Sequence, residues 1–148
     1  MTRIRRGADP KFDDLCAKAA GLSADIEAAR QLPADFAREL AQNSLFSMFV
    51  PSEIGGAALT PPEGMARLEH LARHDAASAW VCMIGSTAAI GAAFIEPEAA
   101  KHIFCAENRI TCGIFAPNGS GYRDGEEYVV SGRWAWASGS ANADYIGL

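Results

Sequence analysis

The spacing of the apolar residues changes after Asn108, and this change constrains the fold more than any other feature of the chain. From Pro10 to Arg30 the apolar residues recur every three or four positions, which is the period of a helix. Beyond Asn108 they form short runs rich in β-branched and aromatic residues, which are typical of strands. The sequence therefore predicts an α+β fold, with a helical bundle domain over residues 1–108 and the beginning of a β-domain over residues 109–148.

Proline, glycine and capping residues divide the first part into helices. Thr60, two prolines and Glu63 form a capping box, and Pro51–Gly56 is expected to turn the chain. Residues 75–94 are rich in Ala, Gly and Ser, so we expect the central, most buried helix there, and we expect no stretch long and apolar enough to span a bilayer. The predicted helices cover residues 10–30, 33–43, 60–74, 75–94 and 97–105.

Three strands are expected in the last third, over 110–115, over 128–136 and from Tyr145 onward. The pair Asp124-Gly125 signals a turn between the first two. A strand that starts at the last residues would leave exposed sheet edges, so we expect the chain to be the front part of a longer protein, with a small closed fold as the alternative.

Composition excludes some partners. A net charge of −5 gives no electrostatic footprint for nucleic acid or an anionic membrane. The four cysteines are scattered without metal-ligand spacing, which is typical of reduced, mostly buried thiols in a cytoplasmic protein. The basic start, with Arg3, Arg5 and Arg6, lacks a following apolar run, so we expect a solvated end and no secretory signal. His70 and His74 have helical i, i+4 spacing but no evident third ligand, so no metal site is predicted.

Two tryptophans, Trp134 and Trp136, stand two positions apart in a predicted strand, so both would point to one face. A purely structural interpretation is that they pack a sheet against its core. However, Ser138-Gly139-Ser140 follows them, and Phe115–Gly121 ends the preceding strand with further small residues. Small residues at two strand ends let a ligand approach the backbone, so the sequence predicts a cofactor cleft.

Three segments resemble the acyl-CoA dehydrogenase superfamily: the Pro-Glu-x-Gly-Gly turn at 49–56, the helix pair at 69–80 and the Trp-containing run at 132–139. The resemblance implies an N-terminal helical domain followed by the first strands of an antiparallel β-barrel-like middle domain. The C-terminal helical domain, which supplies the catalytic carboxylate in dehydrogenases, would be absent from this chain, so the catalytic residues are unknown.

The resemblance also implies a flavin, either FMN or FAD. Trp136 would pack on the isoalloxazine and Ser138 would hydrogen-bond its N5 edge. The other residues implied in cofactor binding are Phe115, Ala116, Asn118 and Ala137, and those implied in substrate binding are Trp80 and Ser120.

Departures from the dehydrogenase pattern indicate a branch of the superfamily. Trp134 replaces a lysine, Ser138 a threonine, Gly139 an asparagine and Ala116 a glutamate. This pattern resembles the oxygenase components of two-component monooxygenases, which hydroxylate aromatic or polycyclic substrates with O2 and reduced flavin from a separate reductase. Ser86-Thr87-Ala88 stands where many members carry a histidine, which argues against a phenol-type hydroxylase.

Two alternatives remain beside that interpretation. One is an acyl-CoA dehydrogenase that transfers hydride from an acyl-CoA to FAD. The other is a non-catalytic helical interaction module. Full-length members of the superfamily are usually homotetramers, so a homo-oligomer is implied.

Overall fold

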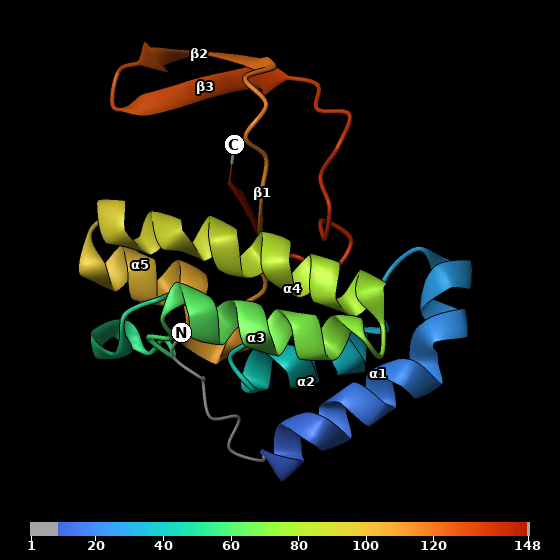
Figure 1. Ribbon diagram of the computed structural model, residues 1–148. Coiled ribbons are helices and arrows are strands. Elements are labelled where there is room, and N and C mark those ends of the chain that lie inside the picture. Colours follow the sequence, from blue (N-terminus) through green and yellow to red (C-terminus); the bar gives the residue numbers. More distant parts are fainter. Residues whose placement is uncertain (1–8, 148) are drawn as a thin grey trace.

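The computed structural model describes residues 9–147, and its element order confirms the α+β prediction (Figure 1). Arg3, Arg5 and Arg6 lie outside the described residues. The helices are α1 (Pro10–Ala29), α2 (Ala34–Gln42), α3 (Pro61–Ala72), α4 (Ala76–Ala88) and α5 (Pro97–Phe104), with short 3-10 turns η1 (Ser52–Ile54), η2 (Ala89–Phe94) and η3 (Ala106–Asn108). The strands are β1 (Thr111–Gly113), β2 (Gly119–Asp124), β3 (Glu127–Gly132) and β4 (Tyr145–Gly147).

Side-chain caps begin several of the helices, because the first turn of a helix leaves backbone N–H groups without partners. Asp75 accepts a hydrogen bond from the backbone N–H of Ser78 at 2.6 Å, which starts α4. The predicted capping box at α3 is confirmed, with the Thr60 N–H donating to Glu63 Oε2 at 2.8 Å. The caps therefore fix the residues at which α3 and α4 begin.

The hydrophobic core is centred on α2 and the apolar segment after it. Its largest fully buried side chains include Phe36, Leu40, Phe46 and Met48. Helix α4 lies on the side of the bundle that faces β2 and β3 and buries one face only; Trp80 on its other face is 53% exposed. The expectation that residues 75–94 form the most buried helix is wrong for this chain, because part of α4 has no covering element.

The segment Ala76–Phe94 also corrects the expectation about membrane spans. With 19 residues and a mean hydropathy of 1.5 it is long and apolar enough, by length and composition alone, to cross a bilayer. In the structure its buried side packs against α3 and β1. A Cβ on Gly85 would lie 2.7 Å from the Thr111 carbonyl oxygen, so the helix approaches β1 as closely as backbones allow. Only 39% of the segment is buried inside the protein.

The strands form two separate pairs. β1 and β4 pair in parallel, with Thr111 opposite Tyr145. β2 and β3 form an antiparallel hairpin, with Asp124 opposite Glu127 and Gly125 at a φ of +62°. The chain turns at Asp124-Gly125 as predicted, but the turn joins β3 to β2, a strand that sequence analysis missed, and not to the strand expected over 110–115. The hairpin stands away from the helices, and its side chains are exposed on both faces (Figure 1).

Two side chains near the end of the chain bind the region around α2. Asp144 accepts two hydrogen bonds from the Arg38 guanidinium, at 2.6 and 2.7 Å, and a third from the Ile110 N–H at 2.8 Å. Asn142 exchanges two hydrogen bonds with the backbone of Leu32, at 2.9 and 3.2 Å. Together they fix the starts of β1 and β4 on the helical body.

The Asp144 clamp predicts a pH-dependent contribution to stability. The hydrogen bonds from Arg38 and Ile110 hold the pKa of Asp144 below its ordinary value. Because Arg38 is partly exposed, we expect Asp144→Asn to lower the free energy of unfolding at pH 7 by about 1–2 kcal/mol. A carboxylate with a lowered pKa stabilises the fold above its unfolded pKa, about 3.9, and the gain disappears as the pH falls through the folded value.

Urea unfolding monitored by circular dichroism at pH 7 and at pH 3 measures this difference. The difference between wild type and Asp144→Asn should shrink at the lower pH. Glu69→Gln, which removes an exposed i, i+4 pair with Arg73, serves as the control and should change the unfolding free energy by less than about 0.5 kcal/mol. Equal effects of the two variants at pH 7 would contradict the role given to Asp144.

Candidate functional site at the base of the hairpin

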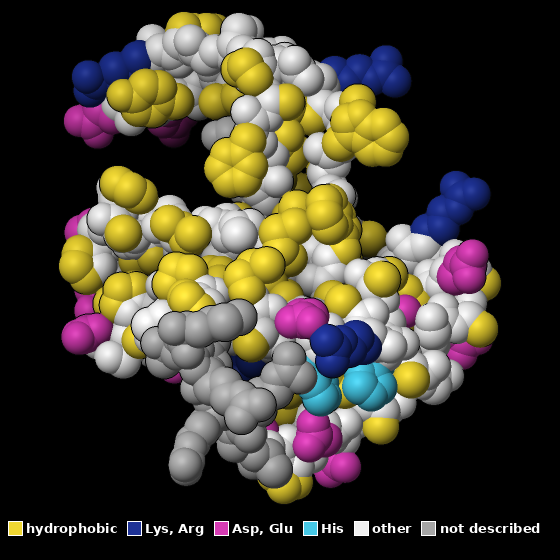
Figure 2. Space-filling model, in the orientation of Figure 1, with side chains coloured by type: hydrophobic (Ala, Val, Ile, Leu, Met, Phe, Trp, Pro, Cys, Tyr) yellow, Lys and Arg dark blue, Asp and Glu magenta, His cyan; other side chains and the backbone are white. Residues whose placement is uncertain are grey.

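Two irregular segments connect the hairpin to the helical body, residues 114–118 before β2 and residues 133–144 after β3 (Figure 1). Both contain residues that the sequence assigned to a cofactor site. Hydrophobic side chains gather on both sides of the gap between the hairpin and the helical body (Figure 2). These two segments and the open face of α4 form the candidate site.

Trp134 ties the two segments together. Its indole Nε1 donates a hydrogen bond to the Ala116 carbonyl oxygen at 3.2 Å. Its ring lies over the pair Gly119 and Gly132, which stand opposite each other in the hairpin. A Cβ on Gly119 would come within 2.6 Å of the indole, and one on Gly132 within 2.5 Å. The ring can occupy this position only because both residues are glycine.

Trp136 and Phe115 are the most exposed aromatic side chains of the site, at 85% and 82%. The prediction that Trp134 and Trp136 share one face of a strand is wrong, because β3 ends at Gly132 and both tryptophans follow it in irregular structure. Trp134 is half-buried under the hairpin, whereas the Trp136 indole is open to solvent. The core-packing interpretation therefore applies in part to Trp134 and does not apply to Trp136 in this chain.

The Ser138–Ser140 turn brings the second segment onto α4. Gly139 has a φ of +84°, and the Ser140 N–H donates to the Ala137 carbonyl oxygen at 3.0 Å. A Cβ on Gly139 would lie 3.3 Å from Val81 Cγ1, so the turn rests on the helix next to Trp80. Ala137 and Ser138 are half-buried there.

The remaining predicted residues lie on the hairpin side. The Asn118 N–H donates to the Ala116 carbonyl oxygen at 2.8 Å, which makes a tight turn before β2, and the Asn118 side chain is exposed. Ser120 lies in β2 opposite Ser131 and is also exposed. The structure thus joins Ala116 to Trp134 and brings residues 137–139 to α4, while Ser120 extends up the hairpin.

Apart from Arg133 and Asp144, which stand at the two ends of the second segment, the site is electrically neutral. Neither 114–121 nor 134–143 contains an ionisable side chain. Beneath the Ser138–Ser140 turn, burial raises the pKa of the Cys112 thiol, so that thiol is uncharged at neutral pH. The two segments can stack on a flat ring and hydrogen-bond its edge through hydroxyl, amide and backbone groups. They cannot supply a general acid or base.

Sequence analysis assigned no individual contact in the site to Trp134, Gly119 or Gly132. A signal for them was present, because Gly119 and Gly132 are equidistant from the two-residue loop Gly125-Glu126, and such a loop places them opposite each other. A ring two residues after Gly132 can then cover the pair of glycines.

A helical bundle that leads into a short β-hairpin, with small residues at the hairpin base, defines the class of this protein. The sequence of residues 12–99 matches the family described as "Acyl-CoA dehydrogenase, N-terminal domain". The chain therefore belongs to the acyl-CoA dehydrogenase family, as the sequence motifs predicted.

The names of individual relatives are more specific than the name of the family. The chain is 29% identical over 117 residues to the indole-3-acetate monooxygenase of Acinetobacter baumannii, covering 77% of the chain and 29% of that protein. It is 24% identical over 125 residues to HsaA of Rhodococcus jostii, named a flavin-dependent monooxygenase, oxygenase subunit, covering 84% of the chain and 33% of that protein. The crystal structure of the 3-HSA hydroxylase from Rhodococcus sp. RHA1 matches with a TM-score of 0.80 at 23% identity, covering 93% of the chain and 36% of that structure, which shows the shared fold. The chain spans about a third of the length of these relatives.

The packing of Trp134 on glycine predicts a specific sensitivity at the hairpin base. In Gly132→Ala the new methyl group would displace the indole, so the Trp134 Nε1–H should lose its hydrogen bond to Ala116. We expect a shifted indole N–H resonance in NMR spectra and local destabilisation of about 1–3 kcal/mol, measured as faster hydrogen exchange in the hairpin.

Gly121→Ala is the matched control. A Cβ on Gly121 would meet only the Val129 carbonyl oxygen at 3.5 Å and Val130 Cγ2 at 3.7 Å, which are ordinary contacts. The Trp134 indole resonance should stay in place in this variant. An unchanged indole signal in Gly132→Ala would show that the ring does not depend on the glycine pair.

Proposed function

We propose that this chain is the N-terminal part of the oxygenase component of a flavin-dependent monooxygenase. The observation that carries the proposal is a neutral, partly exposed aromatic and hydroxyl site, at the base of the hairpin, in a chain of the acyl-CoA dehydrogenase family. The names of the relatives support it, since they are an indole-3-acetate monooxygenase and an HsaA oxygenase subunit. Because the chain covers about a third of each, the rest of the site is expected from residues beyond it.

The residues present fit a flavin ring. Trp136 and Phe115 expose most of their aromatic surface, and such faces stack on planar rings. Gly139 and Ala116 leave backbone accessible beside them, and Ser138 offers a hydroxyl. One side of the ring would contact Trp136, Ala137 and Ser138 from the second segment. The first segment would contact the ring through Phe115, Ala116 and Asn118. When bound, a reduced flavin supplies the electrons that activate O2.

The chain's own residues would act by binding and by excluding water. Trp136 would cover the ring, and Ser138 would hydrogen-bond a polar edge of it. Trp134 would position both segments through its bond to Ala116. Without an ionisable side chain in residues 114–121 or 134–143, the site stays apolar, which favours transfer of oxygen to the substrate over release of hydrogen peroxide. Proton transfer would need groups from outside these segments.

The proposal extends to substrate, partner and assembly. An aromatic or polycyclic compound is the expected substrate class, with Trp80 and Ser120 as contacts, since the named relatives act on indole-3-acetate and on 3-HSA. A separate reductase would deliver reduced FMN or FAD. We also propose a cytoplasmic homo-oligomer, and a division near residue 108 between the helical domain and the middle domain.

An acyl-CoA dehydrogenase is the second candidate, because the family match carries that name. In that case the same aromatic and hydroxyl groups would bind oxidised FAD and orient it toward an acyl-CoA. The base would again come from outside the described residues. The two candidates differ in the redox state of the flavin that binds and in the response to oxygen.

Flavin binding by the complete gene product that contains this chain tests the proposal. We expect reduced flavin to bind tightly under anaerobic conditions and to react with O2 by stopped-flow absorbance. Trp136→Ala should weaken reduced-flavin binding by about 5- to 100-fold, the range of a lost stacking contact, and Ser138→Ala by about 2- to 10-fold.

Phe94→Ala is the control. The Phe94 ring is 83% exposed, like Trp136, but it lies about 20 Å along the helix from Val81, which contacts the site. Its removal should leave flavin binding unchanged. Tight binding of oxidised FAD that an acyl-CoA reduces would replace the proposal with the dehydrogenase. Failure to bind any flavin would favour the non-catalytic interaction module.

A further inference from the structure

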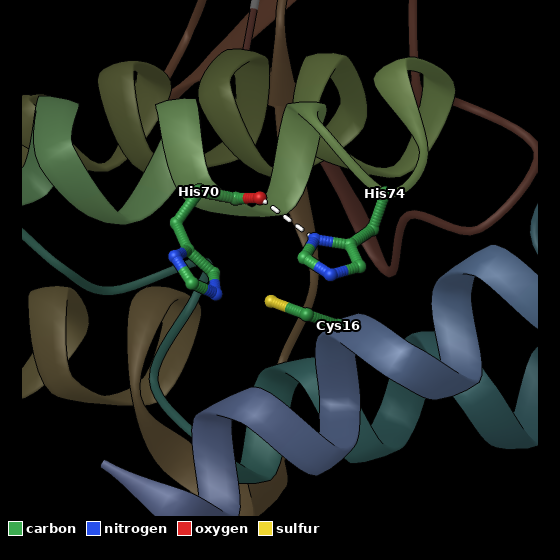
Figure 3. Close-up of side chains that lie close together, drawn as sticks. All are labelled: Cys16, His70 and His74. Atoms are coloured by element: carbon green, nitrogen blue, oxygen red, sulfur yellow. Dashed lines mark hydrogen bonds between the residues drawn. The ribbon is translucent and has the colours of Figure 1, made fainter. Parts of the chain in front are cut away.

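A cluster of metal-binding side chains lies between α1 and the end of α3, apart from the hairpin site. Cys16 comes from α1, His70 from the last turn of α3, and His74 from the residues just after it. Their ligand atoms all lie within 4.8 Å of one another. Figure 3 shows the Cys16 sulfur between the two imidazole rings. Sequence spacing gave only the histidine pair, and the packing of the two helices supplies the third donor.

A backbone hydrogen bond orients His74. Its Nδ1 lies 3.0 Å from the His70 carbonyl oxygen (Figure 3). A carbonyl oxygen can only accept, so Nδ1 carries the proton and donates it. In the neutral ring this leaves Nε2 with a free lone pair. Histidines that bind metals are held in the same way, with the second ring nitrogen donating to a carbonyl or carboxylate.

His70 is held by groups of α1. Its Nε2 lies 3.1 Å from Asp13 Oδ1, and the Phe12 ring packs against it with centroids 5.7 Å apart. Asp13 precedes Cys16 by three residues, so its carboxylate stands on the same side of α1 as the thiol. Asp13 is not among the residues whose ligand atoms all lie within 4.8 Å of one another, so its carboxylate acts as a partner that orients the His70 ring.

Cys16 is fully buried, His70 is half-buried and His74 is exposed. Burial, and after it the charge of Asp13, raise the pKa of the Cys16 thiol to about 11. The exposed imidazole side offers an ion a route from solvent to the buried sulfur.

We propose that Cys16, His70 and His74 bind a zinc ion that links α1 to α3, with a water molecule as the fourth ligand. One sulfur and two imidazole nitrogens are a donor set that zinc prefers. Donors around tetrahedral zinc stand roughly 3.5 Å apart, given bond lengths of about 2.0–2.3 Å. The side chains need to move inward by about 1 Å. This proposal is independent of the flavin site.

Cobalt(II), a spectroscopic substitute for zinc, is the probe for this site. Titration of the complete gene product with Co²⁺ under reducing conditions should give a thiolate-to-cobalt charge-transfer absorption that saturates at a single ion per chain. Zn²⁺ should then displace the cobalt and abolish the absorption. His74→Gln, at an exposed position where folding is not at risk, should weaken binding by at least about tenfold. Cys16→Ala should remove the charge-transfer absorption.

His102→Gln and Cys105→Ser are the matched controls, because they remove the remaining histidine and a half-buried cysteine from elsewhere in the fold. Both variants should bind cobalt like the wild type. The proposal fails if the wild type shows no charge-transfer absorption, or if His74→Gln binds as tightly as the wild type. It also fails if either control variant loses the absorption.

Discussion

The carboxylate of Asp144 is the contact on which the arrangement of the last third depends. It binds the Arg38 guanidinium on α2 and the Ile110 N–H at the start of β1, while the Asp144 N–H donates to the Ile110 carbonyl oxygen at 2.7 Å. One side chain thus fixes the entry to β1, the entry to β4 and their position on the bundle. The parallel pair and the Ser138–Ser140 turn both start from this fixed point. The charge-assisted hydrogen bonds of Asp144 attach the site to the helical body, and the Trp134 indole attaches it to the hairpin.

Neutrality and exposure together give the site its character. The aromatic faces of Phe115 and Trp136 are open in this chain, the backbone is accessible at Ala116 and Gly139, and residues 114–121 and 134–143 hold no ionisable group. Such a surface recognises a flat ring and contributes no proton chemistry. The reaction that we propose therefore divides between recognition in this part of the protein and acid-base groups elsewhere. The zinc site that we propose would serve another purpose, since it would cross-link α1 to α3 on a separate part of the helical body.

Much of the helical part could be predicted, because caps and the spacing of apolar residues act locally. The Thr60–Glu63 box and the Asp124-Gly125 turn were recognised for this reason. The ends of the strands could not be predicted, since β3 stops at Gly132 where Trp134 folds back over the glycine pair, a contact between distant residues. The exposure of α4 depends on which elements cover it, and the meeting of Cys16 with the histidines depends on helix packing. The assigned flavin contacts stay a prediction from the family motifs.

Because β1 and β4 pair with each other, the hairpin is an insertion between two neighbouring strands. The chain leaves the body after Gly113 and returns at Tyr145 beside the strand it left, so the ends of the intervening segment lie next to each other whatever that segment does. The entropy of closing such a loop grows only slowly with its length. Insertions, deletions or wholesale replacement of β2 and β3 should therefore leave the helical body intact. The hairpin is therefore the part of this fold whose length can change with the least effect on the helical body.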